Sequence, residues 1–293
     1  MEILTTLAAW RAYANHERHH GRRVGLVPTM GALHDGHSSL MDAARRECDV
    51  VIATIFVNPR QFNDAADLAR YPRSRSADIR RCERAEVDVV VEPSLPEMWP
   101  AYPRETATTV AVRGVADDFE GADRPGHFDG VASVVTKLLN VTGPCRAYFG
   151  EKDYQQLAVI NQVVRDLALP VSVRSCPIVR DDDGLALSSR NVQLTSESRL
   201  RALALSRALA VANDGTARTA SEVRSALTRV LGEHDVSPAY AEVVHPETLR
   251  PLHDLDHGPG RVLLAAVVDG VRLLDNGPVT LSRVLEDSHA SSH

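Results

Sequence analysis

The chain has 293 residues, a formal net charge of −6 at pH 7, 44% apolar residues and only 4% aromatic residues. This length favours two domains with aliphatic cores, and the acidic balance argues against a general nucleic-acid-binding protein. No apolar run is long enough to span a membrane, and the four cysteines lack metal-type spacing, so we expect reduced thiols in a cytoplasmic protein.

Short apolar runs alternate with helical patterns from Val24 to about Val173. This alternation predicts parallel strands joined by crossover helices, as in a Rossmann-like α/β sheet with helices on both faces. The predicted strands are Val24–Val27, Val50–Val57, Val87–Val91, Arg146–Phe149 and Val171–Val173.

The pattern changes beyond about Val179 and predicts a smaller α+β domain. Two helical stretches, Glu197–Ala212 and Ala220–His234, come first. The strand-like segments that follow are Tyr240–Val244, Val262–Val268 and Val271–Leu274, and Asp269-Gly270 between the last two is a strong hairpin signal. We therefore predict one domain over residues 1–178 and a second over 179–293, with a disordered tail from Asp287 to His293.

Two histidines lie where the first predicted strand meets a helix. His34 and His37 flank Gly36, and apolar positions recur at helical spacing after His37. A helix N-terminus collects unpaired N–H groups and the positive end of the helix dipole, and a glycine there allows close approach of a ligand. The pair therefore predicts a phosphate site that suits ATP. A turn-forming role without a ligand is the alternative, whereas a metal-only site lacks further ligands nearby.

Three later segments support the ligand-binding interpretation. Asn58 and Gln61 follow the second strand, at the end where open α/β sheets bind their ligands. The segment 149–157 repeats this arrangement before a helix from about Tyr154 to Leu167, and 184–191 adds two hydroxyl groups and an arginine. Lysine and arginine provide the charge and the bidentate contacts that a triphosphate requires.

These segments, together with Tyr71–Arg73 and Arg124–Val131, resemble the pantothenate synthetase (pantoate–β-alanine ligase) family of the cytidylyltransferase-like nucleotidyl transferases. The motifs follow the family's order from about Val24 to Asn191. Leu187 stands where the family usually has methionine, an exchange that nearly conserves volume. The resemblance implies ATP-dependent condensation of (R)-pantoate with β-alanine through a pantoyl adenylate, with release of pyrophosphate and AMP.

The resemblance also implies roles for the matching residues. The catalytic residues are expected to be His34, His37, Lys152 and Arg190. The ATP-binding residues are expected to be Met30, Gly36, Gly150, Lys152, Asp153, Leu187, Ser188, Ser189 and Arg190. The pantoate-binding residues are expected to be Met30, Phe56, Asn58, Gln61 and Gln156. Asp78 is the candidate magnesium ligand, and the resemblance further implies a homodimer with a C-terminal lid domain.

Two other functions stay open at this point. Another nucleotidyl transferase of the superfamily would use the histidines and Ser188–Arg190 equally well, although Gln61 and Gln156 disfavour it. A nucleotide sensor without catalysis is disfavoured by the histidines and Lys152. An aminoacyl-tRNA synthetase fragment is disfavoured by the acidic charge and by the lack of a large anticodon-binding extension. We therefore expect small-molecule substrates and neither a nucleic-acid nor a membrane partner.

Overall fold

The computed structural model describes residues 1–215 and 217–282. The chain forms two compact units, the first comprising residues 1–181 and 187–189 and the second comprising 182–186 and 190–293. The predicted tail Asp287–His293 lies outside the described residues. The predicted domain boundary at residue 178 and the lid role of the second domain stay predictions. No described helix is both long and apolar enough to cross a membrane.

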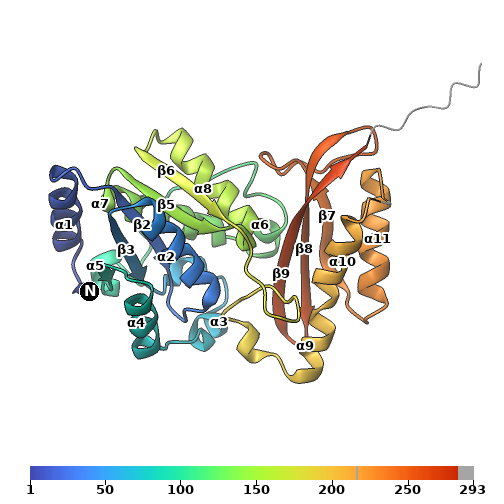
Figure 1. The fold of residues 1–293 in the computed structure, drawn as a ribbon, viewed down its shortest axis with the longest axis horizontal. Helices are drawn as coiled ribbons and strands as arrows, with labels where there is room; N and C mark the ends of the chain where they lie inside the picture. Colours follow the sequence, from blue (N-terminus) through green and yellow to red (C-terminus); the bar gives the residue numbers. More distant parts are fainter. Residues whose placement is uncertain (216, 283–293) are drawn as a thin grey trace, which may run out of the picture. The chain divides into compact units, whose positions relative to one another are not determined.

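A six-stranded parallel sheet with the order β1-β4-β3-β2-β5-β6 forms the centre of the first unit (Figure 1). Its strands are β1 (Glu2–Leu4), β2 (Val24–Thr29), β3 (Val50–Ile55), β4 (Val89–Val91), β5 (Cys145–Gly150) and β6 (Val171–Cys176). All of these except β1 correspond to predicted runs. Strand β1 escaped prediction because it is short and only Leu4 is buried, so pairing with β4 defines it.

Helices cover both faces of this sheet, as predicted. They are α1 (Leu7–His19), α2 (Asp35–Glu47), α3 (Ala65–Arg70), α4 (Arg75–Arg84), α5 (Leu95–Met98), α6 (Glu120–Asp123), α7 (His127–Thr142) and α8 (Tyr154–Asp166). The crossovers through α2 and α8 run in opposite directions across the sheet, so right-handed connections place these helices on opposite faces. Helix α4 contacts α2, whereas α7 contacts both α1 and α8.

The direction of the chain across the sheet reverses between β2 and β5. Strand β2 pairs with β3 from Val24 to Thr29, but it pairs with β5 only at Gly25 and Leu26. The hydrogen-bonded ladder between β2 and β5 therefore stops well before the carboxyl ends of the strands. Open α/β sheets bind their ligands at such a reversal, outside the carboxyl ends.

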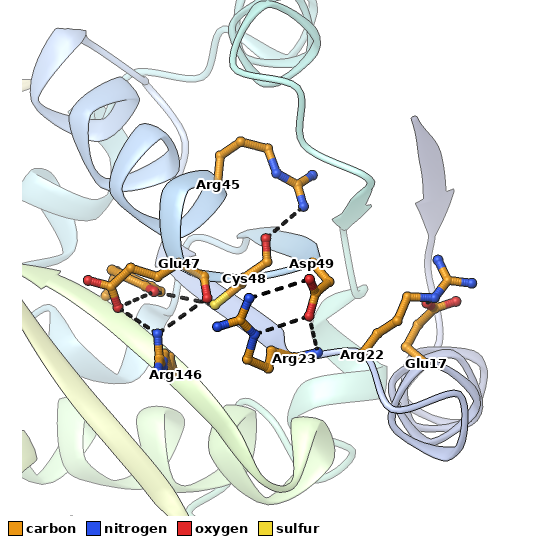
Figure 2. A network of polar contacts seen from close by, with 9 residues as sticks. Glu17, Arg22, Arg23, Arg45, Glu47, Cys48, Asp49 and Arg146 are labelled. Carbon is orange, nitrogen blue, oxygen red and sulfur yellow. Dashed lines mark hydrogen bonds and ion pairs between the residues drawn. The ribbon is translucent and has the colours of Figure 1, made fainter.

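The opposite, amino ends of these strands are linked by polar contacts (Figure 2). Arg23, directly before β2, pairs with Asp49, directly before β3, at 3.2 Å. Glu47 at the end of α2 pairs with Arg146 of β5 at 3.0 Å and accepts a hydrogen bond from the Tyr148 hydroxyl at 3.1 Å. Partly exposed pairs of this kind add little stability individually. Their charges contact one another, whereas the carboxyl ends carry the predicted site residues.

An antiparallel sheet with the order β7-β8-β9 forms the second unit, covered by three helices. These elements are α9 (Ser196–Ala202), α10 (Ala204–Ala212), α11 (Ala220–Gly232), β7 (Pro238–Val244), β8 (Gly258–Val268) and β9 (Val271–Leu281), with a short 3-10 helix, η3 (Asn191–Gln193), before them. The predicted hairpin is confirmed: Asp269 and Gly270 have φ of 48° and 81°, the left-handed values that a tight type I′ turn requires.

One predicted helix of the second unit is wrong in extent. The stretch Glu197–Ala212 contains two helices, with Leu203 between them at ψ −15°. Helix α9 contacts β8, whereas α10 contacts α11 and β9. Because the two parts pack on different elements, tertiary contacts interrupt a sequence pattern that contains no Gly or Pro.

Candidate active site

The first turn of α2 brings both predicted histidines together. His34 is the N-cap residue, and its backbone N–H donates to His37 Nδ1 at 3.3 Å. A neutral His37 that accepts at Nδ1 carries its proton on Nε2. The ring centroids lie 4.1 Å apart, and the buried His34 Nδ1 has no hydrogen-bond partner within the described part of the chain. The pair therefore offers ring nitrogens to a ligand at a helix N-terminus.

Both histidines are neutral at physiological pH. The pKa of His34 is lowered to about 4, mainly by burial and in part by the nearby cations Lys152 and Arg81. Burial also lowers the pKa of His37 to about 3, with an additional contribution from His34. The positive charge of this site consequently comes from Lys152 and Arg81, while the histidines supply single hydrogen bonds.

Lys152 and Asp153 belong to η2 (Glu151–Asp153), a single 3-10 turn after β5. The Lys152 ammonium lies 3.1 Å from Asp153 Oδ1, and its side chain is 21% exposed. The charge of Lys152, which follows β5, contributes to lowering the pKa of His34 and His37, which follow β2. Gly150 precedes this turn, and the nearest atom to a Cβ placed there is the Lys152 N at 4.0 Å.

Gly36 lies between the His34 ring and Leu187. A Cβ at Gly36 would lie 2.9 Å from both Cε1 and Nδ1 of His34 and 3.8 Å from Leu187 Cβ, so glycine is required for this ring position. Leu187 is held by its N–H, which donates to Val179 O at 3.0 Å. Ser188 and Ser189 follow it in the first unit and are half-buried. Arg190 belongs to the second unit, and its approach to the histidines stays a prediction.

Asp78 holds the loop that precedes His34. Its side chain is 2% exposed and accepts hydrogen bonds from the N–H groups of Ala32 at 3.0 Å and Leu33 at 2.8 Å. The Ser74 hydroxyl donates to the same carboxylate at 3.0 Å. No cluster of three or more His, Cys, Asp or Glu that could hold a metal occurs among the described residues. These contacts favour a structural role for Asp78, and its role as a magnesium ligand stays a prediction.

Asn58 and Gln61 frame η1 (Pro59–Gln61), which follows β3. Asn58 is 1% exposed; its amide N–H groups donate to Gln61 Oε1 at 3.1 Å and Gly130 O at 3.2 Å, while its carbonyl accepts from Trp99 Nε1 at 3.0 Å. Asn58 is thus satisfied by the protein itself. The Gln61 Nε2 group makes no hydrogen bond within the described ranges and is available to a ligand.

The other predicted pantoate residues surround the same strand ends. Phe56 is 8% exposed, and its N–H donates to Thr29 O at 3.1 Å, which places it beside the half-buried Met30 that follows β2. Gln156 lies half-buried on the first turn of α8, and its amide makes no hydrogen bond to any described residue. The apolar side chains of Met30 and Phe56, together with amide groups that make no hydrogen bond to described residues, suit a small polar acid with an aliphatic part.

Arg81 lies beside the predicted histidines, although it was not among the residues expected from the sequence. Its guanidinium donates to Asp35 Oδ1 at 2.5 Å and to Ser38 Oγ at 3.4 Å, both on the first turn of α2. Its charge lowers the pKa of both histidines. Arg81 is one of five arginines from residue 70 to residue 81, so the sequence does not single it out. The packing of α4 against α2 distinguishes it from the other four.

Known proteins resemble the chain over nearly its whole length. Residues 2–278 match the family model for Pantoate-beta-alanine ligase. The pantothenate synthetase of Cereibacter sphaeroides is 49% identical over 280 residues, an alignment that covers 94% of this chain and 99% of the relative. The pantothenate synthetase of Anaeromyxobacter dehalogenans is also 49% identical, with 94% and 98% covered.

Solved structures agree with this match. Pantothenate synthetase from Thermus thermophilus superposes with a TM-score of 0.87 at 45% identity, covering 94% of this chain and 99% of that one. Pantoate-β-alanine ligase from Francisella tularensis, solved in complex with β,γ-ATP and β-alanine, gives a TM-score of 0.78 at 35% identity, with 94% and 97% covered. On the strength of the family match and these identities, the chain belongs to the pantoate–β-alanine ligase family.

Proposed function

We propose that this enzyme condenses (R)-pantoate with β-alanine to form pantothenate, using ATP to activate the pantoate carboxylate. One observation carries the proposal beyond family membership. Neutral histidines and Lys152 follow β2 and β5, and two glutamines of the same unit, Gln61 at Nε2 and Gln156 at its whole side-chain amide, make no hydrogen bond there to any described residue. Groups that suit a phosphate and groups that suit a small carboxylic acid thus follow strands of the same sheet, which supports the proposal.

The proposed reaction has two steps. In the first, a pantoate carboxylate oxygen attacks the α-phosphorus of ATP, and the bond to pyrophosphate breaks. In the second, the β-alanine amine attacks the carbonyl carbon of the adenylate, AMP leaves with the electrons of the C–O bond, and the amine loses a proton. Adenylation is needed because a carboxylate oxygen is a poor leaving group, whereas AMP is a good one. The protein mainly positions the reactants and stabilises phosphoryl charge.

The residues divide between the two substrates. We assign His34, His37, Lys152 and Arg190 to the charge that develops on the phosphoryl oxygens. The ATP contacts are proposed to come from Met30, Gly36, Gly150, Asp153, Leu187, Ser188 and Ser189. Pantoate is proposed to bind through the amides of Gln61 and Gln156, with Met30 and Phe56 against its two methyl groups. Asn58, expected from the sequence to bind pantoate directly, has its amide already hydrogen-bonded within the protein and is proposed instead to hold Gln61 through its Oε1.

Magnesium enters the proposal as part of the ATP substrate. Asp78 is 2% exposed and already accepts hydrogen bonds from two backbone N–H groups and a hydroxyl, so it does not fit a direct metal ligand. A Mg²⁺ ion bound by phosphate oxygens and water requires no protein cage. When bound, it neutralises charge on the polyphosphate.

A cytoplasmic homodimer completes the proposal. The four cysteines are free thiols, which suits a reducing compartment where ATP is available. Sedimentation at several protein concentrations tests the dimer, and a single species of monomer mass would contradict it.

Pantoate-dependent exchange of pyrophosphate into ATP tests the function. We expect exchange with pantoate alone, because the adenylate forms before β-alanine is required, and pantothenate and AMP only when β-alanine is added. Exchange that strictly requires β-alanine would exclude the two-step scheme. Replacing pantoate with other small carboxylates separates this enzyme from other nucleotidyl transferases, which would not depend on pantoate.

A further inference from the structure

We infer that the segment Arg124–Gly130 is a positioning device, which fixes the Gln61 amide and ties it to the first turn of α8, where Gln156 lies. The inference rests on the proposed role of these glutamines as pantoate ligands. In the sequence, this segment contributes to the family resemblance, and no separate role is expected of it.

His127 binds the backbone of Gln61 directly. It is 7% exposed, and its Nδ1 donates to Gln61 O at 2.7 Å. Arg124 approaches the other ring nitrogen, Nε2, at 3.3 Å and also donates to Gln61 O at 3.4 Å. Because an arginine only donates, Nε2 is an acceptor and the ring proton stays on Nδ1. The Arg124 contact thus selects the tautomer that holds Gln61.

The first turn of α7 also lies against η1 at backbone contact. A Cβ at Gly130 would lie 2.1 Å from Arg60 O and 2.7 Å from Gln61 N, so only glycine allows this approach. The Gly130 carbonyl in turn accepts the Asn58 amide at 3.2 Å. The backbone contact at Gly130 and the hydrogen bonds of Asn58, Arg124 and His127 therefore fix the backbone position of Gln61.

The same segment continues towards α8. The Arg124 guanidinium lies 3.7 Å from the Glu120 carboxylate, in a pair whose side chains are 16% and 5% exposed. The Glu120 N–H donates to Gln155 Oε1 at 3.0 Å, and Gln155 Nε2 donates to Val115 O at 3.0 Å and Asp118 O at 2.7 Å. Gln155 is 6% exposed, and its amide is hydrogen-bonded to this loop, whereas the adjacent Gln156 amide makes no hydrogen bond to a described residue.

A continuous set of contacts consequently joins the two proposed pantoate ligands. Their separation is set before pantoate arrives, and a preorganised site avoids the ordering cost that a mobile amide would add to binding. His127 and Arg124 are positioning residues in this scheme. Their loss should weaken pantoate binding and leave ATP binding nearly unchanged.

Two substitutions at His127 separate positioning from packing. The Asn amide of His127→Asn reaches the place of Nδ1 and keeps a donor for Gln61 O, whereas the longer side chain of His127→Gln reaches the place of Nε2 and loses that donor. In the pyrophosphate exchange assay, we expect His127→Gln to raise the KM for pantoate about ten- to hundredfold and the KM for ATP less than about twofold. His127→Asn should raise the pantoate KM several-fold less than His127→Gln does. Equal effects of the two substitutions, or a parallel rise in both KM values, would overturn the inference.

A double-mutant cycle with Gln61→Ala tests whether His127 acts through Gln61. If it does, the double variant should bind pantoate no worse than Gln61→Ala alone, because the positioned amide is already absent. Additive losses would refute the positioning role even if His127→Gln lowers the melting temperature. If Gln61→Ala itself leaves the pantoate KM unchanged, the proposed pantoate site fails instead. Should His127→Gln not fold, Arg124→Met on the partly exposed neighbour replaces it in the same cycle, with the same two outcomes.

Discussion

The ring nitrogens of His37 have separate tasks, since Nδ1 accepts the His34 N–H and Nε2 carries the proton. We predict that His37→Ala and Lys152→Ala each lower the rate of pantoate-dependent exchange about 10²–10³-fold, the usual loss for one preorganised donor at developing charge. The melting temperature should fall far less than the rate. Pyrophosphate exchange and thermal unfolding, measured on the same preparations, check this.

The control for this pair is Arg81→Ala. It removes a cation that lowers the histidine pKa values but does not itself lie on the turn that carries them. A smaller loss than for Lys152→Ala is expected. Near-normal exchange by His37→Ala or Lys152→Ala would show that the assigned role is wrong.

At the level of elements, α4 supports α2 through a loop. Asp78→Ala leaves the N–H groups of Ala32 and Leu33 without their acceptor. Each unsatisfied buried N–H costs roughly 1–3 kcal/mol, so we predict a clear loss of unfolding free energy together with reduced exchange. The magnesium concentration that gives half-maximal exchange should stay the same. Denaturant unfolding and a magnesium titration measure the two effects.

The opposite pattern would identify Asp78 as a metal ligand. In that case the magnesium requirement rises and the stability is unchanged. Asp78→Asn sharpens the comparison, because it keeps one amide oxygen as an acceptor and removes the charge that a cation needs.

The hairpin of the second unit depends on its turn. Gly270 has φ 81° and nothing within 4 Å of a Cβ placed there, so Gly270→Ala introduces backbone strain without a clash. We predict a loss of about 1 kcal/mol in unfolding free energy. Gly232→Ala is the matched control, because Gly232 ends α11 in equally open space without a positive φ, and there alanine should be neutral or stabilising. Equal thermal shifts in both variants would contradict the strain argument.

For the whole molecule, buried histidines make stability depend on pH. Burial lowers the pKa of His34 and His127 to about 4 and that of His37 to about 3. In the unfolded chain these groups titrate near the ordinary value of about 6.5, so between about pH 6.5 and 4 the unfolded state binds more protons. The contribution of these neutral histidines to the free energy of unfolding is complete above about pH 7, and it is lost as the pH falls from about 6.5 to 4.

The pH prediction is tested by unfolding free energies measured at intervals from pH 7.5 to 4.5. His127→Asn removes one of these histidines. The slope of the unfolding free energy against pH should therefore fall by up to about 1.4 kcal/mol per pH unit. An unchanged slope would mean that His127 is not neutral in the folded protein.

Much of the fold could be predicted from the sequence, because strands such as β3 and β4 are continuous apolar runs and the hairpin turn between β8 and β9 carries Asp and Gly. Strand β1 and the break at Leu203 were not readable, since both depend on contacts made by residues far along the chain. The smaller unit follows the same rule. Its Asp269-Gly270 turn, a local signal, was predicted, and the packing of α9 was not.

The placement of the two histidines beside each other was predictable, because both belong to one short motif at a helix start. Arg81 and Asp78 could not be placed, because their roles come from the packing of α4 on α2 and on the loop before it. Gln155 was missed for a different reason. It sits beside a predicted ligand with the same side chain, and only its burial and three hydrogen bonds distinguish the two.

Because Gln155 and Gln156 are adjacent, the rotational setting of α8 decides which of the two side chains faces the loop and which one faces the proposed site. Successive residues of an α-helix point about 100° apart, so one glutamine faces the loop of 115–120 and the next faces elsewhere. A residue inserted in η2 would bring Gln155 to the place of Gln156 and Tyr154 to the place of Gln155. A deleted residue would bring Gln156 to the place of Gln155 and Leu157 to the place of Gln156. The length of the connection between β5 and α8 is therefore as strict a requirement as the identity of either glutamine.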